Sequence, residues 1–214
     1  MSKNGLTKPF LVCWTSGFVS GRILYMNGKI KIIKQVEENI KSHILKCRLG
    51  DWEHAKRVAK WVNELGRDRE DLFVLMTVAY IHDIGWRNLI SEKMTFEQLL
   101  ELEPQANKNS EPYIKEVLKE LKYSVSDIEK VLRLVKSADK HESSREDEAI
   151  IVDADSLSKL NINHLREKYQ STDWMKMYNL WNNEFPNRIK TDKAKKLFPS
   201  LLKELKEDIS KESA

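Results

Sequence analysis

The chain has 214 residues, of which 41% are hydrophobic and 33% are charged, and its formal net charge is +4. This length allows one well-buried core with terminal additions, and the composition is typical of a globular protein with a heavily charged surface. The positive charge is spread along the sequence, so it predicts no clear nucleic-acid-binding patch. No apolar run approaches the ~18 residues that a membrane-spanning helix needs, so we expect no membrane partner.

The two cysteines, Cys13 and Cys47, belong to no CxxC pair. A disulfide scaffold or a zinc finger is therefore not expected, and this cysteine usage indicates a reducing, cytoplasmic location. Residues 9–25 mix aromatic residues with two glycines and show no helical period. We therefore predict a weakly ordered N-terminal extension over residues 1–25 and a helical domain over residues 26–214.

Apolar periodicity predicts the first helices. Between residues 30 and 45, isoleucine and valine recur at helical spacing. Asp51 is expected to cap a helix that ends at Gly66. The segment Leu72–Ile84 is apolar at nearly every position, so it predicts a helix buried on all sides that stops at Gly85.

The middle of the chain alternates short elements with polar breaks. After a loop over residues 86–94, we expect a short helix over Thr95–Glu101 and a surface loop from Pro104 to Pro112, where little apolar pattern is present. A helix is then predicted over Tyr113–Leu121. Ser126–Glu129 has the spacing of a capping box, and the helix behind it extends to Ala138.

The C-terminal third is also predicted to be helical. We expect a charged break over residues 143–147, a helix over Ala149–Leu165, a helix through Trp174–Trp181 that Pro186 ends, and a last helix over Lys193–Ile209. No convincing pair of strands is present. The sequence therefore predicts an all-α helical bundle.

The most informative polar residues lie in the most apolar helix. His82 and Asp83 are adjacent there, and a buried carboxylate is costly unless it is paired or binds a metal. His54 lies on the apolar side of its helix, and Asp153 and Asp155 lie in another apolar segment. Imidazoles and carboxylates from three helices can converge on one ion in a bundle.

A mixed set of imidazole and carboxylate ligands suits a divalent metal such as Mn, Fe, Mg, Zn, Co or Ni. Such an ion acidifies bound water and polarises a phosphoryl oxygen, which is the chemistry that hydrolysis of a phosphate ester needs. Periodicity does not choose between Asp153 and Asp155, because both carboxylates lie at the flanks of the apolar stripe of their helix. The other aspartate is a candidate to orient a ligand histidine.

Three motifs carry a resemblance to a known family. His54 is followed by Arg-Val at the third and fourth positions after it, His82 and Asp83 lie within Ala79–Gly85, and Asp153–Leu157 reads Asp-Ala-Asp-x-Leu. This set resembles the HD superfamily of metal-dependent phosphohydrolases, over roughly residues 30 to 207. The resemblance implies an HD-domain-like helical bundle in which His54, His82, Asp83 and Asp155 are the metal ligands and the catalytic residues.

The sequence departs from the family pattern at two positions. Ser156 follows the second aspartate where the family usually has arginine, and Trp86 follows Gly85 where one branch has lysine. We therefore expect a small phosphorylated substrate, with a nucleotide as the first choice, without naming it. The alternative is a catalytically degenerate HD-fold protein that binds a ligand or partner. The oligomeric state is left open.

Three further residues are candidates for substrate binding. Arg57 is one turn after His54, and Arg87 follows the His-Asp doublet, so either is able to clamp a phosphate or to form a surface ion pair. His141, near two lysines at a helix end, is a candidate to donate to a phosphate or to be a solvated helix end. His43 and His164 are expected to be structural or exposed.

Overall fold

The computed structural model describes residues 33–212, and the predicted extension over residues 1–25 lies outside this range. Within it the chain is helical apart from turns and one isolated bridge between Met94 and Tyr169, so the predicted all-α class is confirmed. None of these helices is long and apolar enough to cross a membrane. The helices are residues 33–44, α2 (Asp51–Gly66), α3 (Leu72–Ile81), η1 (His82–Trp86), α4 (Phe96–Glu120), α5 (Val125–Lys140), α6 (Glu146–Lys159), α7 (Ile162–Lys168), η2 (Ser171–Asp173), α8 (Trp174–Arg188) and α9 (Asp192–Glu212).

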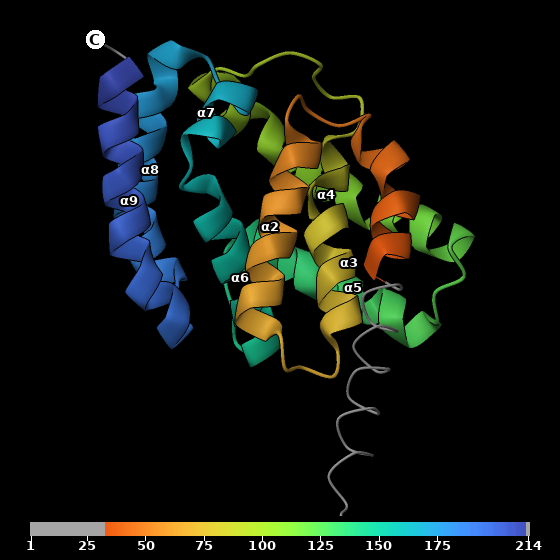
Figure 1. The fold of residues 1–214 in the computed structure, drawn as a ribbon. Helices are drawn as coiled ribbons and strands as arrows, with labels where there is room; N and C mark the ends of the chain where they lie inside the picture. The colour runs from red at the N-terminus through yellow and green to blue at the C-terminus, as the bar shows by residue number, and fades with distance from the viewer. Residues whose placement is uncertain (1–32, 213–214) are drawn as a thin grey trace, which may run out of the picture.

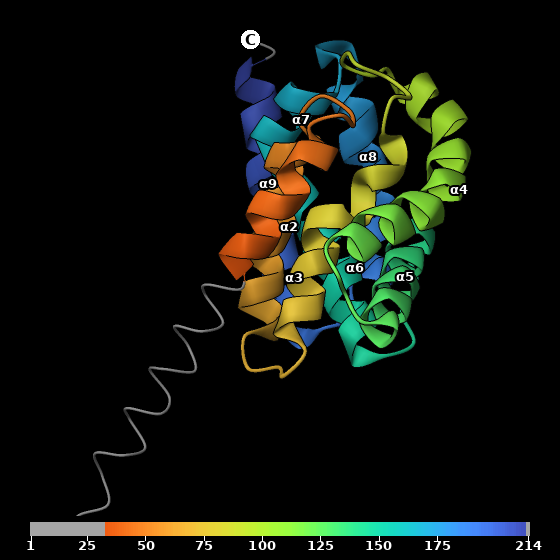
Figure 2. The same cartoon turned by 90° about the vertical axis from the view of Figure 1, so that its right-hand side faces the viewer.

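Two helices, α3 and α6, form the centre of the bundle. Almost all of α3 is buried, and α6 is buried at every position from Asp147 to Ser158. α2 packs against both of them, and α5 contacts both as well. α8 and α9 pair along one edge of the molecule (Figure 1), and α4 lies along the right-hand edge in the view of Figure 2. A helix that is apolar on all faces requires neighbours on all sides, and this arrangement supplies them.

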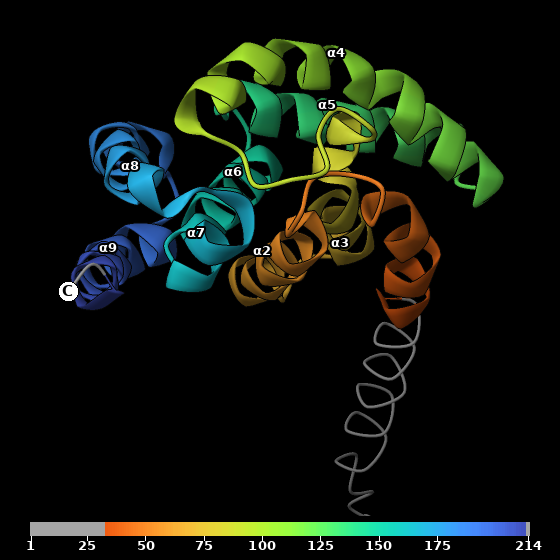
Figure 3. The ribbon, with the colours of Figure 1, turned by 90° about the horizontal axis from the view of Figure 1, so that it is seen from above.

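The predicted surface loop from Pro104 to Pro112 is wrong, because α4 continues through both prolines as one helix of 25 residues. Its buried positions include Ala106, Ser110 and Ile114, which keep helical spacing across the stretch. Two of these are small residues, so the stretch carried little apolar pattern. Each proline removes one backbone donor and favours bending, and α4 follows an arc around α5 in Figure 3.

Gly85 explains why small residues are needed on α4. A Cβ atom at Gly85 would lie 2.1 Å from the carbonyl oxygen of Ala106 and 2.5 Å from Ser110 Oγ. The backbones of η1 and α4 therefore approach closely, and no larger residue fits at position 85. The expected helix stop at Gly85 is wrong, because α3 already ends at Ile81 and Gly85 lies inside the 3-10 turn η1 that follows.

The expected helix over Ala149–Leu165 is two helices. α6 ends at Lys159, and Asn161 then begins α7 by accepting a hydrogen bond from the backbone N–H of Asn163 at 2.9 Å. Asparagine is among the strongest helix N-caps, and this signal outweighs the apolar spacing that crosses the boundary. Pro186 does not end α8, which extends two residues further to Arg188.

Two predicted caps are displaced along the sequence. Gly50, with φ of 82°, precedes α2, and Asp51 is the first helical residue. Ser124 caps α5 by accepting from the backbone N–H of Asp127 at 3.1 Å, so the helix begins before the expected capping box at Ser126. The Asp51 carboxylate is used elsewhere, in a buried ion-pair network beside the candidate site.

Candidate metal centre

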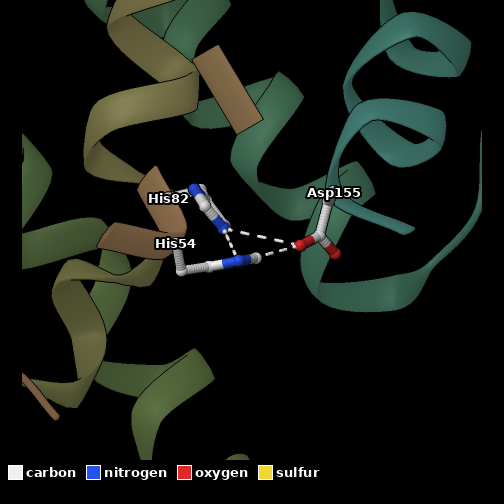
Figure 4. A group of neighbouring side chains, drawn as sticks. All are labelled: His54, His82 and Asp155. Carbon is white, nitrogen blue, oxygen red and sulfur yellow. Dashed lines mark hydrogen bonds and ion pairs between the residues drawn. The ribbon is translucent and has the colours of Figure 1, made fainter. Parts of the chain in front are cut away.

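Three buried side chains from three elements converge on one point. His54 comes from α2, His82 from η1 and Asp155 from α6, and their ligand atoms all lie within 4.8 Å of one another. His54 Nε2 lies 3.2 Å from His82 Nε2 and 3.1 Å from Asp155 Oδ1, and His82 Nε2 lies 3.7 Å from the same oxygen. Figure 4 shows the three side chains directed toward each other.

The hydrogen bonds behind the two imidazoles fix where their protons lie. His82 Nδ1 is 3.1 Å from the carbonyl oxygen of Ala79, which only accepts, so Nδ1 carries the proton. Ser158 Oγ donates to the Asp155 carbonyl oxygen at 2.7 Å and therefore accepts from His54 Nδ1 at 3.1 Å. In the neutral rings both Nε2 atoms are then bare lone pairs. This is how metal-binding histidines are usually held.

The donor set fits a divalent cation. With both rings neutral in these tautomers, the two Nε2 lone pairs 3.2 Å apart and the carboxylate oxygen 3.1 Å away have no proton to share, and Asp155 Oδ1 is a buried acceptor with no hydrogen-bond donor. Ligands ~2.1 Å from one ion, at the angles of tetrahedral or octahedral coordination, are separated by ~3.0–3.4 Å. Two of the three separations lie in this range, and the third, 3.7 Å between His82 Nε2 and Asp155 Oδ1, is slightly longer. The cluster therefore has the chemistry of a metal site and comes close to its spacing.

The charge states of His54 and Asp155 agree with this geometry. Burial, with the nearby charge of Lys168, lowers the pKa of His54 to about 3, which keeps its ring neutral. Burial opposes ionisation of Asp155, but Lys159, whose Nζ donates to Asp155 Oδ2 at 2.7 Å, helps to hold the pKa of the carboxyl well below its usual range. One oxygen of Asp155 is thus paired with a lysine, and the other faces the two histidines.

Asp83 lies beside the cluster and is held by two buried cations. Its Oδ2 atom accepts from Arg48 Nη2 at 2.7 Å and from Lys168 Nζ at 3.2 Å. Burial disfavours a charged Asp83, yet Arg48 and Lys168 hold the pKa of this carboxyl well below its usual range. Both cations also pair with the fully buried Asp51. Oδ2 of Asp83 is 3.7 Å from His54 Nε2, so the carboxylate adjoins the cluster without being part of its closest group.

A cavity of about 180 Å³ opens beside these ligands. One part of its wall is apolar and includes Leu99 of α4 and Trp181 of α8. The remainder is strongly charged. The charged and imidazole side chains along the cavity, beyond the predicted ligands, are Arg48, Glu103, Asp139, His141, Lys159, His164, Lys168, Glu184 and Arg188. A small anion at the cluster would therefore meet several cations.

Of the three predicted substrate-binding residues, only one lines the cavity. His141 lines the cavity, and burial lowers its pKa to about 4. Arg57 instead forms a two-point pair with Glu167, with distances of 3.2 and 2.7 Å. Arg87 pairs with Glu116 at 3.3 Å. Neither arginine belongs to the cavity wall within the described residues.

Asp153 is buried but does not orient a ligand histidine. Its two oxygens accept from the backbone N–H groups of Lys190 and Thr191 at 2.9 and 2.7 Å, so it anchors the connection between α8 and α9. His164 is buried rather than exposed, and its ring packs edge-on against His54 with 4.8 Å between centroids. Of the two aspartates that periodicity left open, the structure therefore brings only Asp155 to the histidines.

Sequence reasoning missed the cations that pair with the predicted ligands Asp83 and Asp155. Lys159 follows Asp155 by four residues, which is a readable helical ion-pair spacing. Arg48 precedes Asp51 by three residues, so this pair was also close enough to suggest contact. Lys168 carried no such signal, because it lies 85 residues from Asp83 and reaches it only through the fold.

No protein-family model, curated protein or solved structure matches this chain. The assignment of a function therefore depends on the chemistry of the site.

Proposed function

We propose that this protein is a metal-dependent phosphohydrolase of the HD type, acting on a small phosphate ester, with nucleotides as the first class to test. The convergence of His54 Nε2, His82 Nε2 and Asp155 Oδ1 beside a cation-lined cavity carries the proposal. Asp83 would complete the ligand set. A cytoplasmic location belongs to the same proposal.

A divalent ion in this site would acidify bound water and polarise a phosphoryl oxygen. The chain's own residues would do the remaining work. Ala79 and Ser158 keep the two imidazoles in the tautomer that presents Nε2. Lys159 and Arg188 line the cavity and are placed to bind the other phosphoryl oxygens. The apolar wall would exclude water from the leaving group.

A second candidate function is a catalytically degenerate HD-fold protein that binds a ligand or partner without turnover. The observation in its favour is that the acidic ligands already have protein cations. Asp83 is paired with Arg48 and Lys168, and Asp155 is paired with Lys159. Such pairs neutralise the carboxylates without an ion, and they would compete with metal binding.

One assay separates the two functions. Protein stripped of metal with a chelator is supplied with Mn, Mg, Co, Ni, Fe or Zn in turn, and phosphate release is followed over many turnovers from a panel of phosphate esters and nucleotides. Metal-dependent turnover that is lost in chelator and in His82→Ala would support the phosphohydrolase. Ligand binding without product in any metal would reject it and favour the binding protein.

A further inference from the structure

Asp139 is a carboxylate in the cavity that nothing above employs. It lies in the last turn of α5, and it lines the cavity together with Ala138 and His141. Among the described residues neither Asp139 nor Glu103 of the same wall has a hydrogen-bond or ion-pair partner, whereas Asp83, Asp155 and Glu184 are all paired. A half-buried carboxylate without a partner is costly in its ionised form, so a structural role does not account for it.

The surroundings of Asp139 favour its protonated form. Burial is the main cause that raises the pKa of Asp139, to about 7 before any ion binds. The negative charges of Asp83 and Asp155 add to this rise, and a bound cation would offset their part while leaving that of burial. The metal-centre carboxylates Asp83 and Asp155 have their pKa values lowered. Carboxyl groups in one site whose pKa values are pushed apart are the usual basis for separate acid and base roles.

We propose that Asp139 is the general acid that protonates the leaving-group oxygen when the phosphate ester is cleaved. This inference rests on the proposed phosphohydrolase function. In the step, the water oxygen forms a bond to phosphorus while the phosphorus–oxygen bond to the leaving group breaks. The leaving oxygen takes the proton of the Asp139 carboxyl and departs as an alcohol. The proton released by the attacking water restores the Asp139 carboxyl.

The neighbouring groups are less suited to this role. His141 lines the same wall, but its lowered pKa of about 4 leaves the ring without the extra proton at neutral pH. Glu184 is engaged with Arg188. Asp139 lines the same cavity as the apolar residues of α8, against which a leaving group would pack.

The test compares two esters with the metal-loaded enzyme. Phenyl phosphate releases a phenol with a pKa of about 10, as for tyrosine, whereas p-nitrophenyl phosphate releases a much better leaving group that needs little protonation. Asp139→Asn should lower kcat for phenyl phosphate by about 10²- to 10³-fold, and for p-nitrophenyl phosphate by about 10-fold or less. Glu142→Gln, an exposed carboxylate three residues further on, is the control and should change neither rate.

Two readouts that do not depend on turnover accompany the rates. Asp139→Asn should keep the melting temperature, because no partner is lost, and it should bind the same number of Mn ions by calorimetry. If Asp139→Asn lowered kcat equally for both esters, or bound one Mn ion fewer, the proposed role of Asp139 would be overturned while the proposed phosphohydrolase function would stand. If the wild-type protein cleaves neither ester nor any other phosphate ester with any metal, the proposed function fails and the role of Asp139 fails with it.

Discussion

The Nε2 atoms of His54 and His82 face each other across 3.2 Å, and each ring carries its proton on the opposite nitrogen. Two lone pairs at this distance repel each other unless a cation or a shared proton lies between them. Burial lowers the pKa of His54, whereas the Asp83 and Asp155 carboxylates raise the pKa of His82 against the effect of its own burial. Without an ion, His82 is therefore the ring that takes up a proton.

The first prediction is that a divalent metal stabilises the folded protein. An ion that binds only the native state at 100 times its Kd adds about 2.7 kcal/mol to the free energy of unfolding. Urea denaturation with and without Mn should show a shift of this size. Asp155→Asn should abolish the shift, because it removes the charge that faces His54 and His82.

Asp153→Asn is the matched control for this experiment, because it changes a buried aspartate on the same helix two residues away. It weakens the acceptors for the N–H groups of Lys190 and Thr191, so it should lower stability by about 1–3 kcal/mol. The stabilisation by Mn should remain. If both variants lost the Mn effect equally, the effect would not arise at the three-residue cluster.

The second prediction concerns the buried ion pairs of Asp83. Asp83→Asn leaves Arg48 and Lys168 with Asp51 alone, and breaking a buried ion pair costs about 3–5 kcal/mol. We expect a loss near 3 kcal/mol in chelator, measured by urea denaturation, because Asp51 still compensates part of the charge. Combined with Lys168→Met, the loss should be less than the sum of the two single losses. Strict additivity would show that Asp83 and Lys168 are not coupled.

The candidate site could be predicted from sequence only as far as local patterns extend. His82 and Asp83 could be identified as candidate site residues because their sequence neighbours are apolar, and His54 because it lies on the apolar face of α2. Periodicity did not choose between Asp155 and Asp153, because the two carboxylates differ by two helical steps and both are buried. The family resemblance implied Asp155, and the fold brings that residue to the histidines. Lys168 could not be found, since it shares no motif with Asp51 or Asp83, and Asp139 could not be found, since it belongs to no motif.

The sequence was enough to predict the all-α class, but not the positions at which individual helices end or continue. The two prolines of α4 indicated a loop, whereas the small residues Ala106 and Ser110 pack so closely on Gly85 that the helix persists. Tertiary packing here overrides the local cost of each missing backbone donor. The opposite error occurred at Asn161, where apolar spacing indicated one helix and the cap divides it into two.

The third prediction tests this close approach. Gly85→Ala places a methyl group 2.1 Å from the Ala106 carbonyl oxygen, so η1 or α4 has to move, at a cost of about 3 kcal/mol or more. Thermal unfolding measures the loss. Gly66→Ala is the control, because its nearest contact is a flexible Leu75 methyl at 3.3 Å and alanine favours the end of α2. A Gly85→Ala variant as stable as Gly66→Ala would contradict the packing.

The last prediction is a pH dependence remote from the metal centre. Asp71 accepts from Arg69 Nε at 2.7 Å and from Lys130 Nζ at 2.7 Å, which ties the α2–α3 turn to α5. The bond from Arg69 is the main cause that lowers the Asp71 pKa to about 2. Because this pKa is depressed by folding, the stabilisation is complete above the unfolded pKa of about 3.9 and is lost as the pH falls toward 2. Asp71→Asn should therefore lower the free energy of unfolding by about 1–2 kcal/mol at pH 7, with the difference from wild type shrinking between pH 4 and pH 2. Urea denaturation across this range measures the free energy of unfolding of both proteins.

Asp68→Asn, which removes an exposed carboxylate from the same turn, should show no comparable loss. A constant difference between Asp71→Asn and wild type down to pH 2 would show that the ion pair is not its source.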